Sequence, residues 1–255
     1  HLMPTPAPYA VASWPWRFRV HALGAFRVEI AGEELREAGK RSGRPTELLK
    51  ALVALGARNV RLERLAETLW PNIDRDYSSR SLNTTLHRLR KLLRDESALI
   101  VQAGELRLSE GLFWLDTWAF ERACNDAQAL TRSTTAPPAA AVMDSVHQAM
   151  TFYAGPLLAG DARLRWTPGP REHYRNLLVQ LLASACGILQ KHGQHEDIVI
   201  LYRQAIEREP LAETLYRPLM QALKNVGRVA DIAEVYQRLC SALATELKTA
   251  PSPAT

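Results

Sequence analysis

The sequence predicts an α+β domain of short strands and three helices, followed by an all-α domain of repeated helix pairs. Three observations lead to this fold class. Hydrophobic residues alternate with a period of two near residue 20, which is typical of half-buried strands, and two short hydrophobic runs flank a turn near residue 103. Between these regions, and through most of the chain after residue 142, they recur at helical spacing. In the second half, several residue types also repeat at an interval of 34 residues.

The composition is typical of a globular protein that folds in water. The chain has 255 residues, of which 47% are hydrophobic and 23% charged, and this length suffices for two domains. It has no apolar run of about 18 residues and no secretory signal, so we expect a cytoplasmic protein without a membrane partner. The cysteines Cys124, Cys186 and Cys240 lack CxxC spacing, which predicts free thiols in a reducing compartment. The net charge of +5 permits a polyanionic partner.

The first domain is expected to begin with strands. Residues 1–16 are rich in proline and alanine and predict a loose leader, whose first three residues resemble a cloning remnant. From Arg17 the alternation predicts two short antiparallel strands, then a turn at Ala31-Gly32 and a third strand around Leu35. The alternating residues are Phe18, Val20 and Ala22 in the first strand, and Phe26, Val28 and Ile30 in the second.

Three helices and a hairpin follow these strands. The predicted elements are a loop over residues 37–44, helices over residues 45–56, 61–70 and 77–94, and strands over residues 99–101 and 106–108. Pro45 suits a first helical turn, and Pro71 closes the second helix. Ala103-Gly104 provides the turn between the last two strands. Strands, three helices and a C-terminal hairpin make a winged helix-turn-helix, with the third helix as reader and the hairpin as wing.

The third helix has two chemically distinct faces. Leucines recur on one stripe, at positions 82, 86, 89 and 93. The opposite side is polar and cationic, with Arg80, Thr84, His87, Arg88 and Lys91. Residues 77–94 include five Arg or Lys and no Asp or Glu. Such a face suits the major groove of DNA, where Arg and Lys reach phosphates and base edges, although an ordinary solvated face would have similar residues.

Two segments of this half carry a resemblance to a known family. RLERLAETLWP and SSRSLNTTLHRLRKLL resemble the OmpR-like DNA-binding domain, and more narrowly its form in the antibiotic regulatory protein (SARP) activators. The resemblance covers about residues 17–116. It implies base reading by Ser81, Asn83, Thr84 and Arg88, phosphate contacts by Arg80, His87, Arg90 and Lys91, and wing contacts by Gln102 and Arg107.

The wing departs from the pattern of this family. Wings of the family usually have glycine followed by an aromatic residue, often with a basic residue near the tip. This wing reads Gln102-Ala103-Gly104-Glu105. An acidic tip should be repelled by a minor groove, because the groove concentrates negative potential.

The second half of the chain is predicted to be helical, apart from a break at residues 131–138 and a long loop over residues 155–170. A first helix is expected over residues 116–130. The 34-residue interval relates Leu189 to Leu223, Gly193 to Gly227, Ile198 to Ile232 and Tyr202 to Tyr236. Glycine at an interhelical turn with this period is typical of tetratricopeptide repeats, which stack helix pairs and bind peptides or partner domains. A generic helical bundle with chance spacing is the alternative.

This half resembles a second family. YAGPLLAG, EREPLAETLYRPLMQAL, GRVADIAEVYQRL and PSPAT resemble the bacterial transcriptional activator domain, which directly follows the winged helix in SARP proteins. Lys248-Thr249-Ala250 is a departure, because the family commonly has glycine there. The expected domains are therefore an OmpR-like winged helix over residues 17–115 and a helical activator domain over residues 116–255. The resemblance implies double-stranded DNA, with repeated half-sites, and RNA polymerase as partners, and two copies could pair on DNA.

Catalysis is not indicated. His192 and His195 have no third ligand nearby, so we expect no metal, and the absence of GxxxxGK[ST] predicts no nucleotide-binding module. We expect no enzyme activity and no cofactor, and no motif indicates a small-molecule effector. The leading hypothesis is a sequence-specific DNA-binding transcription activator. The alternative is a tetratricopeptide-like adaptor whose winged helix binds protein and which a ligand could regulate.

Overall fold

The computed structural model describes residues 14–35, 43–132, 137–161 and 163–253. The chain divides into two compact units. The first unit comprises His1–Ala119 together with Leu157–Arg171, and the second comprises Phe120–Pro156 and Glu172–Thr255. Most of the expected leader and of the loop over residues 37–44, and part of the break over residues 131–138, lie outside the described residues. No described helix is long and apolar enough to span a membrane.

A four-stranded sheet opens the first unit. Its strands are β1 (Phe18–His21), β2 (Arg27–Ile30), β3 (Glu33–Glu34) and β7 (Phe113–Leu115), in the order β3-β2-β1-β7. The strands pair antiparallel except for β1 and β7, which run parallel and place Phe18 and Phe113 in register, with their rings 4.5 Å apart. The sequence did not predict β7, because all three of its residues are buried and show no alternation.

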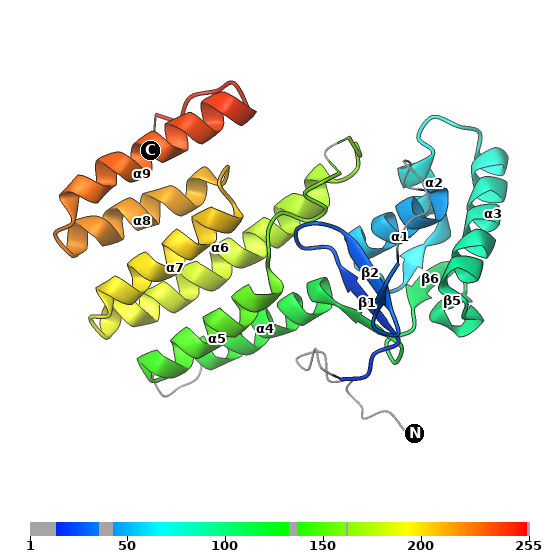
Figure 1. The fold of residues 1–255 in the computed structure, drawn as a ribbon, viewed down its shortest axis with the longest axis horizontal. Coiled ribbons are helices and arrows are strands. Elements are labelled where there is room, and N and C mark those ends of the chain that lie inside the picture. Colours follow the sequence, from blue (N-terminus) through cyan, green and yellow to red (C-terminus); the bar gives the residue numbers. More distant parts are fainter. Residues whose placement is uncertain (1–13, 36–42, 133–136, 162, 254–255) are drawn as a thin grey trace. The chain divides into compact units, whose positions relative to one another are not determined.

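Three helices and a second sheet complete the winged helix-turn-helix (Figure 1). The helices are α1 (Arg44–Ala54), α2 (Leu62–Leu69) and α3 (Arg75–Leu93), and the strands are β4 (Val60–Arg61), β5 (Leu99–Gln102) and β6 (Glu105–Leu108). A short 3-10 turn, η1 (Glu96–Ala98), joins α3 to β5. The β5–β6 hairpin turns at Ala103 and Gly104, both at positive φ, and is the wing. The predicted fold of this half is confirmed.

Helix α3 begins two residues before the expected start because an aspartate caps it. The Asp74 carboxylate accepts hydrogen bonds from the backbone N–H groups of Asp76 and Tyr77, at 2.9 and 3.3 Å. This satisfies donors that have no partner within the helix. The helix ends at Leu93, and Arg94 follows it as the C-cap in the left-handed conformation, with φ of 53°.

The first unit extends past residue 115 through two buried side chains at the start of α4 (Asp116–Thr131). One Asp116 carboxylate oxygen accepts hydrogen bonds from the N–H groups of Ala22 and Leu23, at 2.8 and 2.9 Å. The Trp118 indole donates to the carbonyl of Gly56 at 2.8 Å and is only 1% exposed. Both residues therefore belong to the core of the winged helix, beyond the boundary that the sequence suggested.

Asp116 should make the stability of the first unit depend on pH. Burial raises the pKa of its carboxyl from 3.8 to about 7, against the opposing effect of the backbone N–H groups. The folded state therefore holds a proton that the unfolded state releases, so this contribution is present below about pH 4 and is lost as pH rises towards 7. Asp116→Asn should flatten the pH dependence in this window. All six tryptophans lie in the first unit, so urea unfolding followed by tryptophan fluorescence measures it. An unchanged pH profile in the variant would contradict the assignment.

A second segment of the first unit comes from the middle of the chain. We call residues Leu157–Arg171 the strap. Leu157 and Leu158 are fully buried, and Leu157 forms a single β-bridge with Leu23. The strap includes most of the loop expected over residues 155–170, and its last residues start the next helix.

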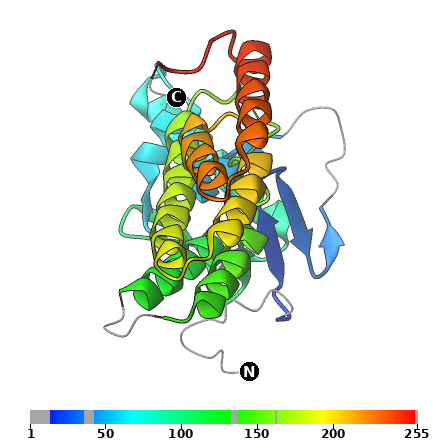
Figure 2. The same cartoon turned by 90° about the vertical axis from the view of Figure 1, so that its left-hand side faces the viewer.

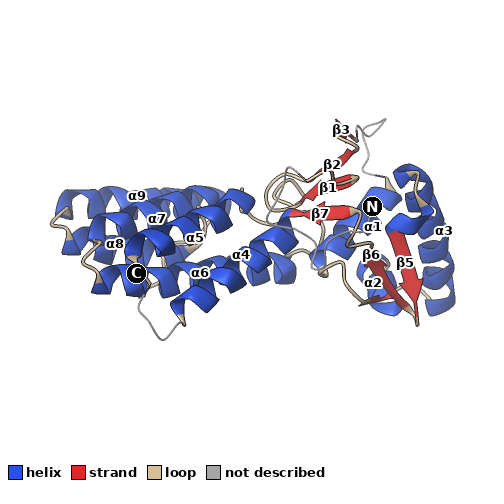
Figure 3. Cartoon of the chain, turned by 90° about the horizontal axis from the view of Figure 1, so that it is seen from below, coloured by secondary structure: helices blue, strands red, loops and turns tan. Residues whose placement is uncertain are grey.

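All regular secondary structure among the described residues of the second unit is helical (Figures 2 and 3). Besides most of α4, its helices are α5 (Ala139–Phe152), α6 (Pro168–Lys191), α7 (His195–Arg208), α8 (Glu213–Asn225) and α9 (Val229–Glu246). Gly193 and Gly227 turn the chain between successive helices, with φ of 72° and 75°, a conformation that suits glycine. The predicted tetratricopeptide-like fold is confirmed.

The two halves of the repeat are buried to different extents. Tyr202 is 5% exposed, whereas its repeat equivalent Tyr236 is 42% exposed, because no described helix follows α9 to cover it. Tyr202 is therefore a core residue. Its replacement by aspartate would place a charge in the core and unfold the unit.

A buried polar network connects α5, α6 and α7 within the second unit. Glu209, just after α7, is 1% exposed and accepts a hydrogen bond from the Tyr153 hydroxyl at 2.5 Å. Its other oxygen accepts from the Arg175 Nε at 3.0 Å. Burial, and then the Glu209 charge, raise the pKa of Tyr153, so the phenol remains a donor. Tyr153 and Glu209 belong to YAGPLLAG and EREPLAETLYRPLMQAL, two of the four motifs that resemble the activator-domain family.

Candidate nucleic-acid interface

Helix α3 is fixed to the first unit by its leucine stripe. Leu82, Leu86, Leu89 and Leu93 are at most 4% exposed, and the helix packs against α1 and α2. Figures 1 and 3 show α3 beside the wing strands β5 and β6. The apolar seam therefore determines which side of α3 remains open to solvent.

The open side of α3 contains most of the expected DNA contacts. The exposed residues are Arg80, Asn83, Thr84, His87, Arg88 and Lys91. Among the residues that the structure describes, Arg80, Arg88 and Lys91 form no ion pair, and the only carboxylate of α3 is Asp76 in its first turn. The Thr84 hydroxyl donates to the carbonyl of Arg80 at 3.0 Å, which leaves its lone pairs free to accept. This face can donate many hydrogen bonds and has a field that attracts anions.

Two of the expected contacts on α3 are less accessible than the others. Ser81 is half-buried. Arg90 is also half-buried, and its guanidinium donates to the carbonyl of Leu99 in β5 at 3.3 Å. This bond links the reader helix to the wing. This bond uses one donor of the Arg90 guanidinium, so fewer donors remain for the phosphate contact that the resemblance implies.

The two expected contacts of the wing, Gln102 and Arg107, lie at different positions along the hairpin. Gln102 is exposed at the tip, directly opposite the half-buried Glu105. Arg107 is half-buried and lies two residues further along β6, opposite Ile100. The tip is also fixed from behind, because the carbonyl of Gly104 accepts a hydrogen bond from Leu62, the first residue of α2, at 2.9 Å. The tip itself has an acidic residue and no basic one.

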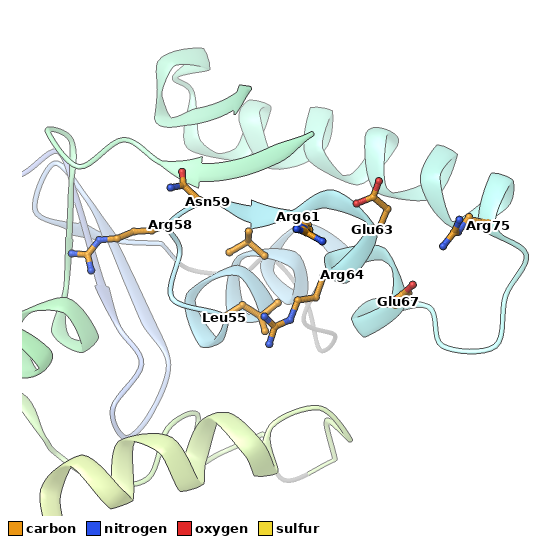
Figure 4. Close-up of a pocket in the computed structure, with 9 residues that line it drawn as sticks. Leu55, Arg58, Asn59, Arg61, Glu63, Arg64, Glu67 and Arg75 are labelled. Carbon is orange, nitrogen blue, oxygen red and sulfur yellow. The ribbon is translucent and has the colours of Figure 1, made fainter. Parts of the chain in front are cut away.

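A groove beside α2 is a second charged surface, which the sequence did not indicate (Figure 4). Its volume is about 890 Å³, and Arg58, Arg61, Arg64 and Arg75 line it together with Glu63 and Glu67. Arg58 is held in place by Glu110 at 3.0 Å and by the ring of Trp118 at 4.6 Å. The charges alternate in RLERLAE, which is typical of a solvated helix face. Two carboxylates among the arginines would repel phosphate, so α3 is the better candidate for binding nucleic acid.

The architecture is that of a transcription regulator: a winged helix-turn-helix with a cationic reader helix, followed by tetratricopeptide-like helices. The model of the bacterial transcriptional activator domain family matches residues 115–255, and the chain belongs to this family. Its members are transcription regulators and not enzymes. With its winged helix, the chain is a regulator of the SARP type.

The chain is similar to one regulatory protein and to one solved structure over most of its length. The chain is 29% identical over 245 residues to the regulatory protein AfsR of Streptomyces coelicolor, covering 92% of this chain and 23% of that protein. It thus spans about a quarter of that relative. The structure of Mycobacterium tuberculosis EmbR in complex with a low-affinity phosphopeptide matches 93% of this chain and 62% of that one, with a TM-score of 0.61 and 18% identity. The second likeness is one of fold.

Proposed function

We propose that this protein binds double-stranded DNA sequence-specifically through the open side of α3 and activates transcription. The observation that carries the proposal is the exposed face of α3, where three cations without ion pairs flank Asn83 and Thr84 and no carboxylate interrupts residues 77–94. A stable leucine seam keeps this face outward. The similarity to AfsR, a regulatory protein by name, supports the same role.

The residue types on this face suit contacts with base edges as well as contacts with phosphates. Arginine can form paired hydrogen bonds with guanine, and asparagine with adenine, in the major groove. We therefore assign base reading to Asn83, Thr84 and Arg88, with Ser81 at the edge of the face. Arg80, His87 and Lys91 are assigned to phosphates, which fix the orientation of the helix on the duplex.

Selection of bound DNA from a random pool tests the proposal. The full chain should enrich a defined sequence, and we expect repeated half-sites if two copies bind together. RNA polymerase is the proposed partner of the helical unit, and run-off transcription from the selected site tests that part. Enrichment of no sequence would contradict the DNA-binding proposal.

A protein-binding adaptor is the second candidate function. The groove beside α2, with its mixed charges, is the observation that favours it, because protein partners present both signs of charge. An adaptor should show no sequence preference in the selection and no change in DNA binding when α3 is altered. The two candidates therefore separate in the same experiment.

Arg88→Ala should weaken binding at the selected site by about 1–3 kcal/mol and relax the preference at one base pair, because a paired contact to one base is lost. Competition titrations against single-base variants of the site measure both effects. Arg238→Ala, which removes an exposed arginine from α9, is the control for loss of one positive charge. Equal weakening on all sequences would show that Arg88 contacts phosphate instead.

Salt dependence should distinguish phosphate contacts from base contacts. Lys91→Ala should reduce the slope of log affinity against log salt by about 0.9, because one fewer counterion is released. Arg80→Ala should have the same effect, whereas Thr84→Ala should alter sequence preference and leave the slope unchanged. Arg90→Ala should change the slope less than Lys91→Ala, since its guanidinium is bonded to the wing. Unchanged affinity and slope for Lys91→Ala would exclude this face.

A further inference from the structure

The backbone of the strap forms hydrogen bonds with the corner between β1 and β2. The N–H groups of Leu158 and Ala159 donate to the carbonyls of Ala22 and Gly24, at 2.7 and 2.9 Å. On the other side of the corner, Asp116 accepts from the N–H groups of Ala22 and Leu23. The corner is therefore held from both sides by residues that follow the winged helix in sequence.

Hydrogen bonds from Arg171 stabilise the conformation of the strap. Leu158 is a non-glycine residue at a φ of 52°, a left-handed conformation that bulky side chains rarely adopt. Arg171 compensates by donating to the carbonyls of Leu157 and Leu158, at 2.7 and 2.6 Å. The strap is thus a built part of the first unit, although it lies within residues 115–255, which match the activator-domain family.

One ion pair connects the strap to helix α1 of the winged helix. The Lys50 ammonium on α1 lies 3.0 and 3.1 Å from the two carboxylate oxygens of Asp161 and 5.0 Å from the ring centroid of Phe26. The Lys50 side chain is only 9% exposed, whereas Asp161 is 24% exposed. Because so little of the Lys50 side chain is exposed to water, its positive charge is stabilised mainly by the Asp161 carboxylate.

Helix α1, which contains Lys50, packs against α3. Leu48, Leu49 and Leu52 of α1 are at most 1% exposed, and α1 packs directly against α3. Since packed side chains allow little independent movement, a shift of α1 displaces the reader helix. The contacts therefore run from the strap through Lys50 to α1 and then to α3.

We propose that Asp161 is a positioning residue for DNA recognition: by neutralising Lys50, the strap of the activator domain sets the position of α1 and, through it, of the reader helix. This inference rests on the proposed DNA-binding function. It makes the strap, a segment of the activator-domain sequence, part of the structure that positions α3.

The test compares Asp161→Asn with the double variant Lys50→Met/Asp161→Asn in the full chain. Asp161→Asn leaves a covered, unneutralised ammonium, and it should lower affinity for the selected site by about tenfold. The slope against salt should stay as in the parent protein, because no phosphate contact is removed. The double variant should recover most of the affinity, since no buried charge remains. Asp126→Asn, which breaks the exposed Arg122–Asp126 pair, is the matched control and should have no effect.

Hydrogen exchange of the same variants in the absence of DNA provides an independent measurement. Asp161→Asn should speed exchange in α1 and α3, and the double variant should restore protection. Faster exchange without any DNA binding by the parent protein would support the strap contacts and refute the proposed function. If Asp161→Asn shows the same hydrogen exchange and the same DNA affinity as the parent protein, the positioning role is wrong. Failure of the double variant to recover would overturn it as well, because the orphaned charge would not be the cause.

Discussion

Glu209→Ala should destabilise the second unit by about 3–5 kcal/mol, because it removes the buried partner of a charged group. Glu209 is 1% exposed and connects Tyr153 to Arg175. In the variant, the phenol keeps a buried donor without an acceptor. The half-buried Arg175 guanidinium loses its buried counter-charge and keeps only the exposed carboxylate of Glu172, at 2.9 Å. This loss is a large part of the total stability of a domain, about 5–15 kcal/mol.

The arrangement of tryptophans makes this prediction easy to check. The second unit contains none of the six, so circular dichroism at 222 nm follows mainly its helices, while tryptophan fluorescence follows the first unit. In urea, Glu209→Ala should shift the helical transition and leave the fluorescence transition in place. Glu234→Ala, an exposed site on α9, should shift neither by more than about 0.5 kcal/mol. A Glu209→Ala protein with the parental helical transition would show that the network is dispensable.

The second large effect is expected from truncation. The sequence predicted the winged-helix domain over residues 17–115. Such a fragment lacks Asp116, Trp118 and the strap, all of which contribute buried groups to the first unit. Loss of the Trp118 side chain alone should cost about 3–5 kcal/mol, and each uncovered leucine of the strap about 1.5–3 kcal/mol. We therefore expect the fragment to be largely unfolded at 25 °C.

A matched pair of fragments tests this expectation. Residues 17–119 joined to residues 157–171 by a flexible Gly/Ser linker restore all of these groups, and this fragment should unfold cooperatively in urea. Residues 17–115 should show no cooperative fluorescence transition. In the truncated fragment Lys50 gains water when the strap is absent, so its charge adds little to the loss, unlike in Asp161→Asn. A cooperative transition of parental midpoint in residues 17–115 would show that the strap and Asp116 contribute little.

The local patterns of the sequence determined much of this protein. The leucine spacing of residues 82–93 predicted the buried side of α3, and with it the face that remains cationic. Two short hydrophobic runs on either side of the Ala103-Gly104 turn predicted the wing, and the 34-residue interval predicted stacked helices with turns at Gly193 and Gly227. These features depend on residues within a few positions of one another, where the period of a helix or strand directly fixes which side chains share a face.

The tertiary structure alone decided how distant segments meet. Asp161 reaches Lys50 across 111 positions, Asp116 reaches Ala22 across 94, and Glu209 reaches Tyr153 across 56. In sequence, each of these carboxylates resembles the many that lie in water, and Arg90 resembles the exposed Arg88 two positions before it. Periodicity shows which side of an element is buried but not which other element covers it. The partner of a buried charge is therefore set by the packing of whole elements.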